Sequence, residues 1–121
     1  MIPYLNGGRD PAIGLDCWGL CRIARVWLYG MPMLPEIAGR YELQLEQITE
    51  KCNEQVATMR KVELFTPRSL ITVKRGSLCY HVALCLDDGM ILETQRQTGV
   101  RLLSQRDFQR AHYKAELESY I

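Results

Sequence analysis

The stretch that decides the fold is GLDCWGLCRIARVWLYG, residues 14–30. Its apolar positions recur with helical spacing, at Cys17, Leu20, Cys21, Ala24 and Leu28. Asp16 stands at the position of a helix N-cap, and Gly30 stands where the helix should end. We therefore predict a helix that begins at Cys17, which places the Cys17 thiol in the first helical turn.

A cysteine in the first turn of a helix is well placed for nucleophilic chemistry. The unpaired backbone N–H groups and the positive end of the helix dipole both favour its thiolate form. The same N–H groups can stabilise the oxyanion that forms when a thiolate attacks a carbonyl. Cys17 is thus a candidate nucleophile. The alternative is a small buried residue with a structural role only, which is common for cysteines.

On either side of this helix the sequence pattern changes. Residues 1–15 carry several glycines and prolines without periodicity, which predicts an irregular, turn-rich segment. A second helix is predicted by apolar residues at helical spacing, namely Tyr41, Leu45, Ile48, Cys52, Val56 and Met59. After Pro67, runs rich in apolar and β-branched residues predict strands over 69–74, 81–86, 90–95, 99–103 and 113–121. A short helix over 104–111 would begin with a Ser104-x-x-Asp107 cap.

This order of elements predicts an α+β fold, with N-terminal helices followed by a mainly antiparallel β-sheet. His81 begins the most strand-like run and is the candidate base. Alternation divides that strand between two faces, one with His81, Ala83 and Cys85 and the other with Val82, Leu84 and Leu86. We expect the second face to be the core face and the His81 face to look toward the helix that carries Cys17.

The turn after this strand decides which residue can orient the His81 ring. Residues 87–89, Asp-Asp-Gly, suit a three-residue hairpin loop with glycine in the left-handed conformation. That loop pairs His81 with Gln95 and places Glu93 diagonal to His81 on the same face. The Glu93 carboxylate could then fix the imidazole tautomer and stabilise the imidazolium. Gln95 is the rival, because it lies directly opposite His81. A two-residue loop at 88–89 would instead turn Glu93 to the other face.

The remaining histidine and cysteines predict no second site. His112 follows the short helix without a partner pattern around it, so we expect it on the surface. The 5 cysteines are odd in number and lie in apolar segments, which is typical of free thiols. A metal protein is the weaker alternative. Cys17 and Cys21 lie one helical turn apart, and Cys79 lies close to His81, but no cysteine or histidine pair has the spacing of a zinc site. We expect no metal.

Composition and charge exclude several classes of protein. The 121 residues, 47% hydrophobic, are enough for one core, and no linker divides them, so we expect a single domain over residues 1–121. A net charge of +1 without a block of like charges argues against nucleic-acid binding. The apolar run 78–86 is about half the length of a membrane span, and no signal peptide is recognisable. We therefore expect no membrane span and synthesis as a cytosolic chain.

Three blocks of the sequence resemble the signature blocks of NlpC/P60 cysteine peptidases. They cover residues 4–8, 14–20 and 81–89 and occur in the family's order. The form GGRDP at residues 7–11, together with DCWGL at residues 16–20, is similar to the branch found in phages and prophages near tail-assembly proteins.

This resemblance implies a papain-like fold and the hydrolysis of peptidoglycan stem peptides, typically at the bond between D-glutamate and a diamino acid, without a cofactor. By the same matching Cys17 would be the nucleophile, His81 the base and Glu93 the third polar residue, which is usually histidine in the family. The substrate site would be lined by Tyr4, Asp16 and Trp18. Asp16 would meet a substrate ammonium, and Tyr4 would donate a hydrogen bond near the thiolate.

A second hypothesis is a non-catalytic phage tail component that keeps the fold for assembly with other tail proteins. Two features motivate it. Glu93 is unusual as the third residue, and the chain begins too close to Tyr4 for the helix that precedes this block in the family. Under both hypotheses the virion tail is an expected location.

Overall fold

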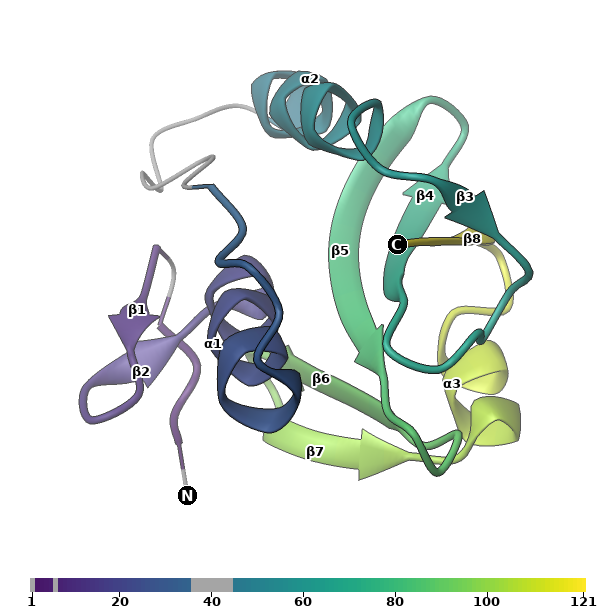
Figure 1. Ribbon diagram of the computed structural model, residues 1–121. Helices are drawn as coiled ribbons and strands as arrows, with labels where there is room; N and C mark the ends of the chain where they lie inside the picture. The colour runs from purple at the N-terminus through teal and green to yellow at the C-terminus, as the bar shows by residue number, and fades with distance from the viewer. Residues whose placement is uncertain (1, 6, 36–44) are drawn as a thin grey trace.

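The computed structural model describes residues 2–5, 7–35 and 45–121. It has the predicted α+β architecture, with helices packed on a mainly antiparallel sheet (Figure 1). The main sheet has 6 strands in the order β3 (Lys61–Val62), β8 (Glu116–Tyr120), β4 (Leu70–Arg75), β5 (Leu78–Cys85), β6 (Ile91–Gln95) and β7 (Gly99–Leu103). Its helices are α1 (Cys17–Tyr29), α2 (Leu45–Val56) and α3 (Gln105–Ala111). No helix in the described ranges is both long and apolar enough to cross a membrane.

The N-terminal segment is more regular than its sequence predicts. Strands β1 (Arg9–Asp10) and β2 (Gly14–Leu15) form a small antiparallel sheet beside α1. The sequence did not predict this pairing, because strands of two residues are too short to show an alternating pattern.

Helix α1 begins and ends where the sequence predicts. The Asp16 side chain accepts a hydrogen bond from the Gly19 backbone N–H at 2.8 Å, which caps the helix directly before Cys17. Gly30 ends the helix in the left-handed conformation, with φ of 60°. The prediction that Cys17 is a first-turn residue is confirmed. In the second predicted helix, Tyr41 lies outside the described residues and Met59 lies beyond the end of α2.

Both faces of the sheet are buried, which corrects one expectation. Val82 and Leu84 pack against α1 and α2, in a cluster with Trp18, Cys21, Ala24, Cys52 and Val56. Ala83 and Cys85 lie on the opposite face, in a cluster with Ile71, Val73, Ile91 and Phe108 of α3. Figure 1 shows α1 and α3 on opposite sides of β5. The prediction that this face looks toward α1 was therefore wrong for Ala83 and Cys85, which α3 covers, but His81 itself hydrogen-bonds with Cys17 at the start of α1.

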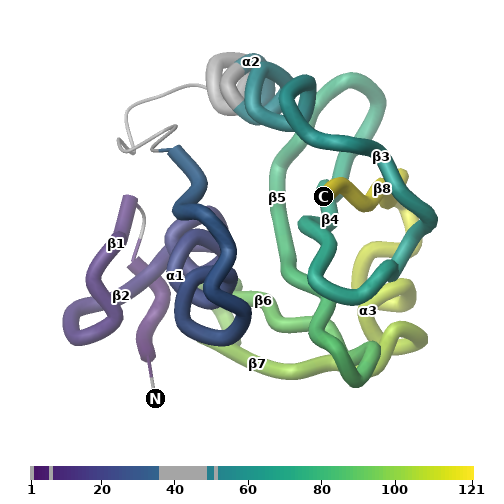
Figure 2. Tube along the Cα trace, in the orientation of Figure 1, coloured from purple at the N-terminus to yellow at the C-terminus, as the bar shows by residue number. Residues whose placement is uncertain are grey.

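The hairpin loop between β5 and β6 has the predicted length and register. Leu86 donates its backbone N–H to Met90 at 2.8 Å, and Gly89 is left-handed with φ of 84°. The ladder pairs are Leu84 with Leu92 and Cys85 with Ile91. The expected pairing of His81 with Gln95 is absent from the ladder, because β6 and β7 turn away while β5 continues (Figure 2).

A β-bulge in the middle of the sheet decides which way the His81 region faces. Val73 pairs with His81, but Lys74 pairs with Cys79, so Tyr80 is the extra residue of β5. As a result Cys79 packs in the cluster with α1 and α2. Tyr80 packs instead against the cluster on the α3 side.

Two contacts of Cys79 attach α2 to β5. The Thr49 hydroxyl accepts a hydrogen bond from the Cys79 backbone N–H at 3.0 Å. The sulfur atoms of Cys52 and Cys79 lie 3.5 Å apart. Both cysteines are free thiols, as are Cys17, Cys21 and Cys85, in agreement with the sequence.

Candidate active site

Cys17 and His81 come from different elements and line the same pocket. Cys17 is the first residue of α1 and is half-buried, whereas His81 lies in β5 and is buried. The pocket has a volume of about 170 Å³ and is completed by Tyr4, Tyr80 and residues 94–97. A thiol and an imidazole thus meet in one small depression at the N-terminal end of a helix.

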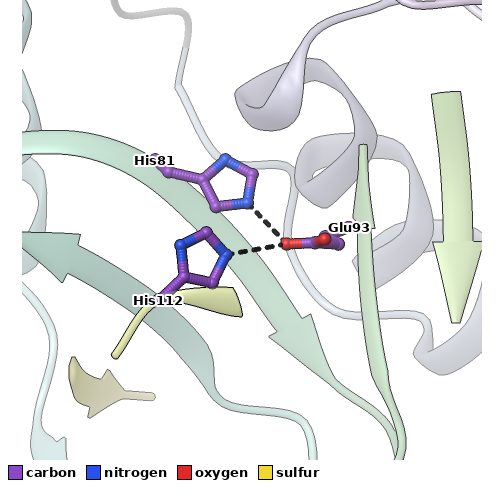
Figure 3. Close-up of side chains that lie close together, drawn as sticks. All are labelled: His81, Glu93 and His112. Atoms are coloured by element: carbon purple, nitrogen blue, oxygen red, sulfur yellow. Dashed lines mark hydrogen bonds and ion pairs between the residues drawn. The ribbon is translucent and has the colours of Figure 1, made fainter. Parts of the chain in front are cut away.

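The His81 ring is held by a carboxylate on its far side. The Nε2 atom of His81 lies 2.9 Å from Oε1 of Glu93, and the Glu93 side chain is fully buried (Figure 3). A carboxylate is an acceptor, so this contact assigns the Nε2 proton to the imidazole. Nδ1 is the ring nitrogen that remains for Cys17.

Glu93 is surrounded by hydrogen-bond donors. His112 contributes Nε2 at 3.2 Å from Oε1, and Arg101 contributes Nη2 at 2.7 Å and Nε at 2.8 Å from Oε2. Gln95 adds a longer contact, with Nε2 3.4 Å from Oε1. Burial alone would raise the pKa of Glu93, but the hydrogen bonds from His112, His81 and Arg101 hold it well below its usual range. The carboxylate is therefore charged at neutral pH.

The same partners favour a charged His81 ring. Burial acts to lower the pKa of His81, but hydrogen bonds with Cys17 and Glu93, and negative charge on both, outweigh burial and raise it to about 9. Such a ring can take the thiol proton and remain charged at neutral pH. The arrangement is suited to forming a thiolate–imidazolium pair.

His112 corrects the sequence prediction most clearly. It is buried rather than on the surface, and its ring stacks on the His81 ring with centroids 5.2 Å apart. Its Nδ1 atom lies 3.4 Å from the Tyr80 hydroxyl, and both imidazoles point at the same Glu93 oxygen (Figure 3). No sequence signal places His112 there, because the contact depends on how α3 docks on the sheet.

Arg101 is a second functional neighbour that the sequence analysis missed. It pairs directly across the β6–β7 hairpin with Glu93. An opposite-charge pair facing across a hairpin is a recognisable pattern, so extending the register argument by one strand would have found this residue.

The three predicted substrate residues have different outcomes. Tyr4 lines the pocket beside Cys17, as expected. Asp16 is buried and already occupied, since Arg9 Nη1 lies 2.6 Å and the Gly7 backbone N–H 3.0 Å from its carboxylate. Asp16 is thus a helix cap with its own cation, not an open partner for a substrate ammonium. Trp18 is only 4% exposed and packs in the core, so the expectation that it lines the substrate site was wrong.

One group of described residues has ligand atoms close enough for a metal ion. These atoms belong to His81, Glu93 and His112 and lie within 4.8 Å of one another. The hydrogen bonds to Glu93 and its ion pair with Arg101 already account for this geometry, and the guanidinium opposes a further cation. We therefore interpret the group as a hydrogen-bonded network.

Comparison with known proteins identifies a family and solved structures of similar fold. The model of the NlpC/P60 family matches residues 2–118. The crystal structure of the NlpC/p60 domain of the peptidoglycan hydrolase SagA superposes with a TM-score of 0.62, at 22% sequence identity, over 98% of this chain and 86% of that chain. No protein among the curated ones searched gave a significant match. The fold described above is thus the NlpC/P60 fold.

Proposed function

The chain belongs to the NlpC/P60 family, and we propose that it is a cysteine peptidase that hydrolyses peptidoglycan stem peptides at the bond between a D-glutamyl residue and a diamino acid. The observation that carries the proposal is the shared pocket of Cys17 and His81, with the far side of the imidazole held by buried Glu93.

The first half of the reaction forms an acyl-enzyme. His81 Nδ1 takes the Cys17 proton, and the thiolate attacks the scissile carbonyl carbon. Backbone N–H groups at the start of α1 stabilise the oxyanion, while the N–H of Gly19 is already used by Asp16. The imidazolium then donates its proton to the leaving amine as the C–N bond breaks, which leaves a thioester on Cys17.

The second half releases the acyl group. His81 takes a proton from water, the resulting hydroxide attacks the thioester, and the proton returns to the Cys17 sulfur. Glu93 stays ionised throughout and stabilises each imidazolium that forms. Arg101 and His112 keep Glu93 in place by their hydrogen bonds.

We extend the proposal to a phage tail on the resemblance of residues 7–11 and 16–20 to the phage and prophage branch. In this proposal the protein is made in the host cytoplasm and acts on the cell wall as part of the tail. Purification of tail particles, followed by detection of this chain in them, tests the location separately from the activity.

The activity is tested by digesting purified peptidoglycan with the wild type, Cys17→Ala and Cys21→Ala. Cys21 lies one turn away on α1 but is buried in the core, so its variant controls for the loss of a thiol. We expect the wild type and Cys21→Ala to release stem-peptide fragments whose masses identify the bond, and Cys17→Ala to release none. Equal release by Cys17→Ala would contradict the role of Cys17 as nucleophile, and no release by the wild type would contradict the peptidase proposal and favour a non-catalytic tail component.

A further inference from the structure

One cation stands at the rim of the pocket and has no role in the chemistry above. Arg96 lies in the turn between β6 and β7 and lines the pocket together with Cys17 and Thr94. It is exposed, and no carboxylate within the described ranges forms an ion pair with it. Every other lysine, arginine, aspartate and glutamate of the described chain lies off the pocket wall.

The Arg96 side chain is oriented by an aromatic ring. Its guanidinium carbon lies 5.7 Å from the centroid of the Tyr4 ring, and Tyr4 also lines the pocket. Arg96 also hydrogen-bonds with the Tyr4 hydroxyl. A guanidinium carries five N–H donors, so the others can match the two oxygens of a carboxylate.

A second polar group in the pocket wall, the Thr94 hydroxyl, has no hydrogen-bond partner among the described residues. Thr94 is fully buried. A buried hydroxyl without a partner costs free energy unless a ligand supplies one. Thr94 lines the same pocket as Cys17 and His81.

We propose that Arg96 and Thr94 form an anion subsite that selects substrates with a free carboxylate beside the scissile bond. The inference rests on the proposed function. In a γ-linked glutamyl peptide the α-carboxylate of the glutamyl residue remains free. Three carbon atoms separate it from the scissile carbonyl group. The subsite therefore distinguishes stem peptides with this carboxylate from those in which it has been converted to a carboxamide.

The test uses two synthetic γ-D-glutamyl–diamino acid peptides that differ only in this group, carboxylate or carboxamide. We expect the wild type to show a kcat/KM about tenfold higher for the carboxylate, a typical value for an exposed but charge-assisted contact. Arg96→Gln should reduce this preference to about twofold or less by losing the charge. Arg106→Gln removes an exposed arginine of α3 and should behave as the wild type. A wild type without preference, or a preference kept in Arg96→Gln, would overturn the inference.

Thr94→Val supplies a nearly isosteric second variant, so the fold should persist. We expect the carboxylate preference to fall by about threefold through loss of one hydrogen bond. An unchanged preference would remove Thr94 from the subsite.

A binding experiment separates this inference from the proposed activity. If neither peptide is hydrolysed, the peptidase proposal fails, and binding of the same peptides to Cys17→Ala by calorimetry decides the subsite. Tighter binding of the carboxylate peptide that is lost in Cys17→Ala with Arg96→Gln supports the subsite without any turnover. Equal binding of the two peptides, or no binding of either, overturns it.

Discussion

Two buried carboxylates lie next to the candidate catalytic residues, Asp16 beside Cys17 and Glu93 beside His81. They differ in the groups that hold them. Asp16 precedes Cys17 and is held by backbone N–H groups and Arg9, none of which changes charge near neutral pH. Glu93 is held by Arg101 and two imidazoles. The first carboxylate fixes the position of the nucleophile through the backbone, whereas the second is coupled to a proton that moves during the reaction. We therefore expect Asp16 to act mainly on stability and Glu93 on both stability and chemistry.

The largest effect should come from removing the Glu93 carboxylate. Glu93→Leu leaves two buried imidazoles and Arg101 without their acceptor, so kcat/KM should fall on the order of 10³-fold and the free energy of unfolding by about 3–5 kcal/mol. Glu93→Gln keeps an oxygen that can accept from His81, and it should lose only about 10- to 100-fold in kcat/KM. Steady-state kinetics and urea unfolding measure both. Full activity of the leucine variant would transfer the role to Gln95.

Substitution of Asp16 should affect the free energy of unfolding more than kcat/KM. Asp16→Ala removes the cap of α1 and the partner of Arg9, and should lower the free energy of unfolding by about 2 kcal/mol. The kcat/KM of the folded variant should stay within about tenfold of the wild type, because Cys17 and His81 remain. Asp16→Asn keeps the cap and serves as the matched control. A rise in KM confined to substrates with a free ammonium would instead restore the predicted substrate role.

The pH dependence of kcat/KM should also distinguish the roles of Glu93 and Asp16. With the pKa of His81 raised to about 9, the charged ring persists at neutral pH and kcat/KM should fall as the pH rises through about 9. His81 also contributes stability that is complete below its ordinary pKa of 6.5 and is lost as the pH approaches 9. In Glu93→Gln the alkaline fall of kcat/KM should move to lower pH, whereas Asp16→Asn should leave it in place. An identical profile in both variants would contradict the coupling of Glu93 to His81.

The smallest effect should come from His112, which acts on His81 only through Glu93 and the ring stack. His112→Asn should reduce kcat by about three- to tenfold with little change in KM, because the catalytic groups shift slightly. Tyr80→Phe removes the hydroxyl on the other side of the His112 ring and should have less effect still. A loss in His112→Asn as large as that in Glu93→Leu would make His112 an essential member of the site.

Local signals in the sequence predicted much of this site. The cap at Asp16 placed Cys17 in a first turn, and the three-residue loop at 87–89 set the register that puts Glu93 near His81. Both predictions depend on residues close in sequence, where capping and turn chemistry act directly. The catalytic roles assigned to Cys17, His81 and Glu93 stay predictions.

What the sequence could not predict depends on long-range packing. His112 became buried because α3 covers the sheet face that had been expected to look toward α1. Trp18 packs into the core because α1 lies on the Val82 face, a choice that alternation alone leaves open. Binary patterns identify two faces of a strand, but only the docking of distant helices decides what covers each one.

The bulge at Tyr80 also has a consequence for changes in chain length. In a regular strand, deleting one residue turns all side chains on one side of the deletion to the opposite face. At this bulge the deletion of Tyr80 would remove the extra residue and restore a regular ladder, in which Cys79 still pairs with Lys74 and His81 with Val73. The cost would be the contact between the Tyr80 hydroxyl and His112, the packing of Tyr80 on the α3 side, and its part of the pocket wall. Position 80 is thus a place where a one-residue deletion leaves the imidazole facing its carboxylate.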